Sequence, residues 1–122
     1  YLARLSGSTA EFLSMWALMM MGKQPFTMSD DGTLQLYLSP KLPRWMFHEK
    51  EKTVSFMFLG KVLVTYYNDN YGDTWMLEPE SVVITMLDGE QIIFDDGVVP
   101  SPYAEMVRDG QVEFIDVLLY YP

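Results

Sequence analysis

The sequence predicts a mostly β protein, an antiparallel β-sandwich preceded by one apolar α-helix. From Pro25 onward, apolar and polar residues alternate in short runs, which is typical of strands with one buried face. Turn residues separate the runs about every ten positions, the spacing of a sandwich with about seven short strands. The chain has 122 residues, 49% of them hydrophobic, so it suits one domain with a filled core.

The helix is predicted from about Thr9 to Met21. Ser8 with Glu11 has the form of a capping box, in which a hydroxyl and a glutamate three residues on satisfy the first free N–H groups. Good helix formers follow. Gly22 stands where a left-handed residue ends many helices, and Pro25 lies just beyond it.

This helix is apolar on nearly every side, and only Glu11 and Ser14 are clearly polar. A helix of this kind needs cover nearly all round, but one sheet of a small sandwich covers one side. We therefore expect either further chain segments or a second copy of the protein to pack on it. The apolar positions are Phe12, Leu13, Met15, Trp16, Leu18, Met19, Met20 and Met21.

The remaining elements follow from local signals. Asp31-Gly32 and Asp88-Gly89 are hairpin turns between apolar runs. Pro102 is suited to the first turn of a short helix that reaches about Arg108 before Gly110. The expected strands lie at 34–38, 53–59, 62–67, 81–87, 90–94 and 112–120, with a loop at 68–73.

Charge and composition exclude several functions. The net charge is −9 and no run of Lys or Arg occurs, so nucleic acid and anionic membranes are excluded as partners. The longest apolar run, Phe12 to Met21, is too short to cross a bilayer. Cysteine is absent, which excludes disulfides and leaves the compartment open. We expect the protein to be located in the cytoplasm.

No set of residues predicts catalysis by this chain. His48 is the only histidine and is followed by charged residues, as expected at a surface. The acidic pairs lie in turn-like stretches, where Asp is favoured for local hydrogen bonds. The loop at 68–73 fails the calcium pattern, because Tyr71 falls at a ligand position and Thr74 replaces the turn glycine. We expect no catalytic residue, metal or cofactor in this chain.

Two places are candidates for binding. Tyr71 and Trp75 flank the polar loop, where exposed aromatic rings could stack on sugars, although strand aromatics usually fill a core. Ser8 and Thr9 present hydroxyls at a helix start, where free N–H groups favour an anion. A simple helix cap is the alternative for that pair.

Several spaced motifs occur in an order that resembles the end of the cellobiose phosphorylase family. The match covers residues 5–67. The motifs are Gly7-Ser-Thr-Ala-Glu-Phe12, Met21-Gly-Lys-Gln-Pro25, Asp31-Gly-Thr-Leu-Gln-Leu-Tyr-Leu-Ser-Pro-Lys-Leu-Pro43, Phe58-Leu-Gly60 and Val64-Thr-Tyr66. The resemblance implies that residues 1–25 are the terminal helix of an upstream α/α barrel and 26–122 a C-terminal β-sandwich domain.

The resemblance also implies a function. Family members split a disaccharide with inorganic phosphate, and relatives use water; the catalytic Asp lies in the barrel. The threonine of the phosphate pocket corresponds to Thr9, with Ser8 beside it. This sequence departs from the family at Glu11 and Phe12, and a carboxylate near the pocket would repel phosphate. Hydrolysis or an altered specificity is therefore the alternative to phosphorolysis.

These observations leave three alternative functions. In the first, the chain is the accessory end of a sugar phosphorylase-like or glycoside hydrolase-like enzyme, inactive alone, whose partners are the upstream barrel and an oligosaccharide substrate. In the second, it is a free-standing carbohydrate-binding module. In the third, it is a structural domain whose apolar helix pairs between copies in a homo-oligomer.

Overall fold

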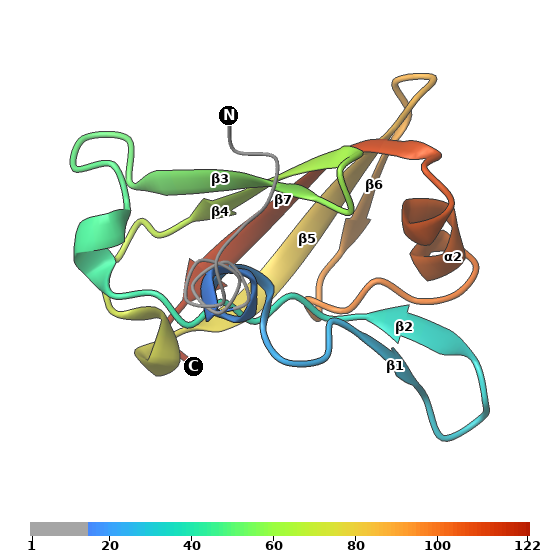
Figure 1. Cartoon of the computed structure of the whole chain (residues 1–122), viewed down its shortest axis with the longest axis horizontal. Helices are drawn as coiled ribbons and strands as arrows, with labels where there is room; N and C mark the ends of the chain where they lie inside the picture. Colours follow the sequence, from blue (N-terminus) through green and yellow to red (C-terminus); the bar gives the residue numbers. More distant parts are fainter. Residues whose placement is uncertain (1–14) are drawn as a thin grey trace, which may run out of the picture.

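The computed structural model describes residues 15–122 and contains two β-sheets, with a helix over 15–21 packed on the core (Figure 1). The mostly β class predicted from the sequence is confirmed. The strands are β1 (Phe26–Met28), β2 (Leu34–Leu36), β3 (Thr53–Phe58), β4 (Val62–Tyr67), β5 (Glu78–Met86), β6 (Gln91–Phe94) and β7 (Val112–Tyr120). Short helices are η1 (Arg44–Met46), η2 (Thr74–Met76) and α2 (Tyr103–Arg108).

The larger sheet has the strand order β3-β4-β7-β5-β6, and the smaller one is the hairpin of β1 and β2. The last strand lies at the centre of the larger sheet, between two local hairpins (Figure 1). It runs antiparallel to β5 but parallel to β4, so the sheet is mixed where an antiparallel one was expected. A period of two in apolar residues specifies the faces of a strand but not its direction.

One face of the larger sheet is buried. Alternate residues of the central strands β4, β5 and β7 point into the core, including Val64, Ile84, Ile115 and Val117, all fully or almost fully buried. The residues between them, such as Tyr67 and Phe114, lie on the opposite face and remain partly accessible. We call this opposite side the open face. The smaller sheet, the helix over 15–21 and α2 all contribute buried residues to the core side.

The helix over 15–21 is anchored to the core by its last turn. Met20 is buried, and its carbonyl accepts a hydrogen bond of 2.6 Å from the buried Tyr66 hydroxyl. The carbonyl of Met19 accepts the Lys41 N–H at 2.7 Å. Gly22 ends the helix with φ 85°, as predicted, and a Cβ there would collide with the Ser39 carbonyl. Residues 9–14 of the expected helix lie outside the described residues.

The other predicted elements agree closely with the structure. The turns at Asp31-Gly32 and Asp88-Gly89, the loop at 68–73 and a short helix before Gly110 are all present. The sequence did not predict β1, whose three residues pair with β2. A further bridge between Leu36 and Val99 joins this hairpin to the segment that leads into α2.

Candidate functional site

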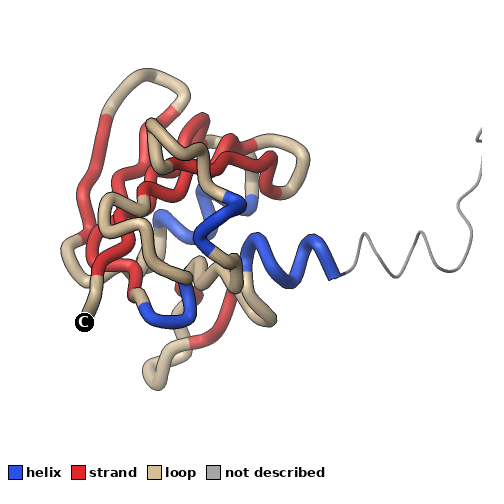
Figure 2. Tube along the Cα trace, turned by 90° about the vertical axis from the view of Figure 1, so that its left-hand side faces the viewer, coloured by secondary structure: helices blue, strands red, loops and turns tan. Residues whose placement is uncertain are grey.

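The helix over 15–21 presents an apolar surface that the rest of the described chain does not cover. Met15 is 59% exposed, Leu18 48% and Trp16 39%. We call these three side chains the exposed helix face. Figure 2 shows the helix at the rim of the molecule, with its first described turn standing clear of the strands. Isolated exposed apolar residues are common, but three on a single turn of a helix form a patch.

A groove of about 190 Å³ continues this patch onto the sheet. It lies between the helix and the edge strand β3 and includes Trp16, Ala17, Phe56, Met57 and the turn residue Leu59. Met57 and Leu59 are themselves exposed. The apolar surface therefore extends from the helix onto the edge of the larger sheet. Such a surface can bind an apolar partner, and the described residues that line it carry no group for acid–base or nucleophilic chemistry.

A second feature is a pair of exposed tryptophans on two adjacent one-turn helices. Trp45, in η1, is 74% exposed, and Trp75, in η2, is 59% exposed. The Arg44 N–H donates to the Asp73 carboxylate at 2.8 Å, so the two turns lie side by side. We call Trp45 and Trp75 the tryptophan pair.

The buried Thr74 fixes this arrangement. Its N–H donates to the Leu42 carbonyl at 2.9 Å, and its hydroxyl accepts the Leu42 N–H at 2.6 Å. The same hydroxyl donates to the Pro40 carbonyl at 2.8 Å. The two indoles are therefore carried on a rigid support, which lowers the entropy lost when a ligand stacks on them.

The residues predicted to bind ligands are placed as follows. Ser8 and Thr9 lie outside the described residues. Trp75 is exposed, whereas Tyr71 is partly buried and packs against the core. Sequence reasoning did not select Trp45, although a tryptophan directly after Pro43-Arg44 was a usable signal.

Of the acidic pairs Asp30/Asp31, Asp69/Asp73 and Asp95/Asp96, two carboxylates accept hydrogen bonds within their own turns. The Asp31 carboxylate accepts hydrogen bonds from the Ser29 and Thr33 side chains, which lower its pKa from the usual range. The Asp96 carboxylate accepts the Val98 N–H at 3.1 Å. Nδ1 of the exposed His48 accepts the N–H groups of Lys50 and Glu51. Asp31, Asp96 and His48 therefore act within local turns, whereas the Asp73 carboxylate accepts the N–H of Arg44, 29 residues away.

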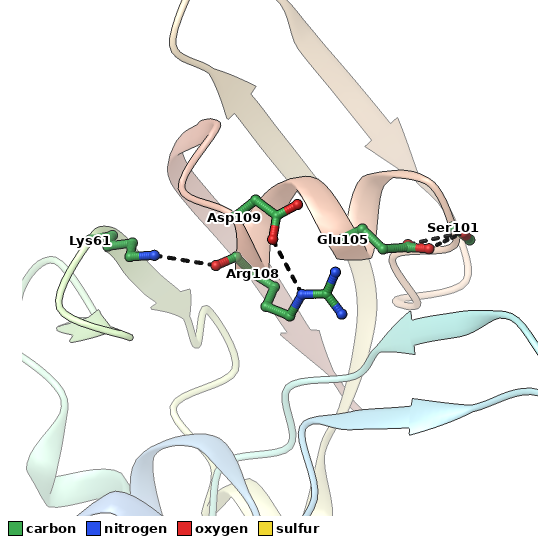
Figure 3. A network of polar contacts seen from close by, with 5 residues as sticks. All are labelled: Lys61, Ser101, Glu105, Arg108 and Asp109. Atoms are coloured by element: carbon green, nitrogen blue, oxygen red, sulfur yellow. Dashed lines mark hydrogen bonds and ion pairs between the residues drawn. The ribbon is translucent and has the colours of Figure 1, made fainter.

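A polar cluster around α2 fixes the ends of that helix (Figure 3). The Ser101 hydroxyl donates to the Glu105 carboxylate at 2.7 and 2.9 Å. At the other end, the Lys61 ammonium donates to the Arg108 carbonyl at 3.3 Å, a favourable place for a cation. The Arg108 guanidinium pairs with Asp109 on the surface. Lys61 thus caps a carbonyl of the last turn, whereas the Ser101–Glu105 contact joins two side chains and caps no backbone group.

Within residues 15–122, no group of three or more His, Asp or Glu side chains is placed to hold a metal ion. In the same described part, no helix has the length and apolar character that crossing a membrane requires. Comparisons with protein-family models, with curated proteins and with solved structures find no match for this chain.

Proposed function

We propose that this chain is the C-terminal accessory region of a carbohydrate-active enzyme that resembles cellobiose phosphorylases. The chain has no catalytic role alone. Its helix and sandwich brace an upstream α/α barrel in the same polypeptide, and the helix start contributes Thr9 and Ser8 to the sugar or phosphate site. The parent enzyme acts on an oligosaccharide in the cytoplasm, with inorganic phosphate as co-substrate or with water.

The observation that carries the proposal is the exposed helix face with its groove. The last turn of the helix is fixed to the core by the buried Tyr66 and Met20, while Met15 and Leu18 of the same helix are exposed. A helix buried on one side and apolar on the other is suited to lie between two bodies. The order of the sequence motifs supports a barrel as the second body.

The test compares two matched variants in the complete product of the gene and in the 122-residue chain. Met15→Glu places a charge on the exposed helix face. Met28→Glu makes the same change on the β1–β2 hairpin, at a residue 64% exposed. In the isolated chain, each variant is expected to unfold within about 0.5 kcal/mol of wild type, because both side chains are exposed.

In the complete product we expect Met15→Glu to lower both the melting temperature and the turnover of disaccharide, because the charge would be buried against the barrel. Met28→Glu is expected to leave both unchanged. The release of sugar phosphate or of free sugar distinguishes phosphorolysis from hydrolysis. Equal behaviour of the two variants, or activity of the isolated chain, would contradict the proposal.

The tryptophan pair favours a second candidate, a free-standing carbohydrate-binding module. Trp45 and Trp75 are exposed on a rigid support, as a sugar-stacking platform requires. This candidate predicts that the isolated chain binds oligosaccharides and that Trp45→Ala removes the binding. The accessory role predicts no effect of Trp45→Ala on sugar binding by the isolated chain.

A further inference from the structure

A shallow groove of about 370 Å³ lies on the open face of the larger sheet, on the other side from the helix. The strand register builds it from neighbouring rows of side chains. Tyr67 on β4 pairs with Leu118 on β7, and Asp116 on β7 pairs with Val83 on β5. Val83 in turn pairs with Ile93 on the edge strand β6. The groove volume falls within the range of small-molecule sites, about 300–1,000 Å³.

Three side chains make the apolar part of this groove. Val83 and Leu118 come from adjacent central strands, and Ile93 beside them is 64% exposed. The ring of Tyr67 forms one wall. This combination offers apolar and aromatic surface to the C–H groups of a ligand.

The polar side chains of the lining supply hydrogen-bond acceptors, and one of them, Asp116, comes from the central strand beside Val83. The Tyr67 hydroxyl donates to Asp116 Oδ1 at 3.0 Å, which fixes the position of both groups. A carboxylate has about four acceptor positions, so Asp116 can still accept from a ligand. Asp69 and the amide of Gln91 complete the polar part of the lining. Among residues 15–122, no Lys or Arg lines this groove, and its two carboxylates would repel a phosphate or another anion.

We propose that this groove, which we call the open-face groove, binds a neutral oligosaccharide. A sugar has apolar C–H faces for the apolar side chains of the groove and many hydroxyl donors for its carboxylates and amide. The choice of a sugar among neutral polyols rests on the proposed function. Side chains alternate along β4, so Tyr66 faces the helix and Tyr67 the groove. The groove therefore remains accessible when the barrel covers the exposed helix face. It would bind part of a substrate chain at a distance from the barrel.

The test titrates the 122-residue chain with cellopentaose and maltopentaose and follows methyl signals by NMR. We expect one of these sugars to shift the methyl signals of Val83, Ile93 and Leu118. The methyl signals of Leu87, which is exposed on the β5–β6 turn outside the groove, should remain unchanged.

Two variants test whether the shifts depend on a carboxylate of the groove. Asp69→Asn removes one charged acceptor and is expected to weaken binding about tenfold. Asp30→Asn makes the same change on the exposed β1–β2 turn and should have no effect. Tyr67→Ala should abolish binding. If that variant fails to fold, Asp69→Asn still decides the question, because its side chain is exposed and its shape is retained.

Three results would overturn the inference. The first is that neither sugar shifts the groove methyl signals. The second is that pentalysine shifts them and the sugars do not, which would assign the groove to a basic peptide. The third is that a sugar shifts the indole signals of Trp45 and Trp75 alone, which places the sugar site elsewhere and leaves a carbohydrate function standing. The Met15→Glu comparison tests the accessory role separately, so the two proposals can fail independently.

Discussion

Replacing Thr74 by valine tests whether its hydroxyl holds the two tryptophan turns together. Thr74 is 3% exposed, and valine keeps its shape while removing both hydrogen bonds of the hydroxyl. The N–H of Leu42 and the carbonyl of Pro40 would then lose these partners at buried positions. Each unsatisfied buried group costs about 2 kcal/mol, and the added buried methyl group offsets about 1 kcal/mol. We expect a loss of about 3 kcal/mol in the free energy of unfolding.

The assay is urea unfolding at neutral pH, followed by circular dichroism. Thr74→Ser is the matched variant, because serine keeps the hydroxyl and loses only a methyl group, at about 1 kcal/mol. Thr65→Val removes a hydroxyl that bonds to Ser55 on the open face and should cost less than about 0.5 kcal/mol. If Thr74→Val unfolds within 0.5 kcal/mol of wild type, the reasoning about the buried hydroxyl is refuted.

Two further predictions concern the core and one turn. Tyr66→Phe should cost about 1–2 kcal/mol in urea unfolding, because the buried Met20 carbonyl loses its donor. Burial raises the pKa of Tyr66 above that of tyrosine in the unfolded chain, so the unfolded chain loses this proton at lower pH than the folded one. The stability of the fold is therefore full below about pH 10 and falls at higher pH. Tyr66→Phe should lessen this alkaline loss of stability. Gly97→Ala should cost about 3 kcal/mol in thermal unfolding, because φ is 77° and the new Cβ would collide with the Pro79 carbonyl. Gly89→Ala, with open space around it, should cost about 1 kcal/mol, and equal losses at the two glycines would contradict the steric argument.

The strands and turns were largely predictable because each depends on local chemistry. The Asp88-Gly89 turn between β-branched runs predicted the β5–β6 hairpin, and the runs at 53–59 and 62–67 were predicted as strands, which pair as β3 and β4. The position of β7 was not predictable in this way. Its alternation specifies one buried face, but no local signal states which strands lie beside it or in which direction they run.

The candidate sites were predictable in part. The nearly all-apolar composition of the helix indicated a surface in need of a partner, and Met15 and Leu18 are exposed. The tryptophan pair depends on Thr74 joining segments that are 32 residues apart, a contact that no local pattern contains. The open-face groove depends on the register of four strands, which is likewise a product of the tertiary fold.

The central position of β7 has a consequence for how the chain folds. The hairpins β3–β4 and β5–β6 can each form from neighbouring residues as soon as they are synthesised. They share no strand pairing until β7 enters between them. Until then each hairpin has an unpaired edge and an uncovered apolar face, which is a state prone to aggregation. Pairings between distant segments slow folding, so the arrival of β7 is expected to set the folding rate.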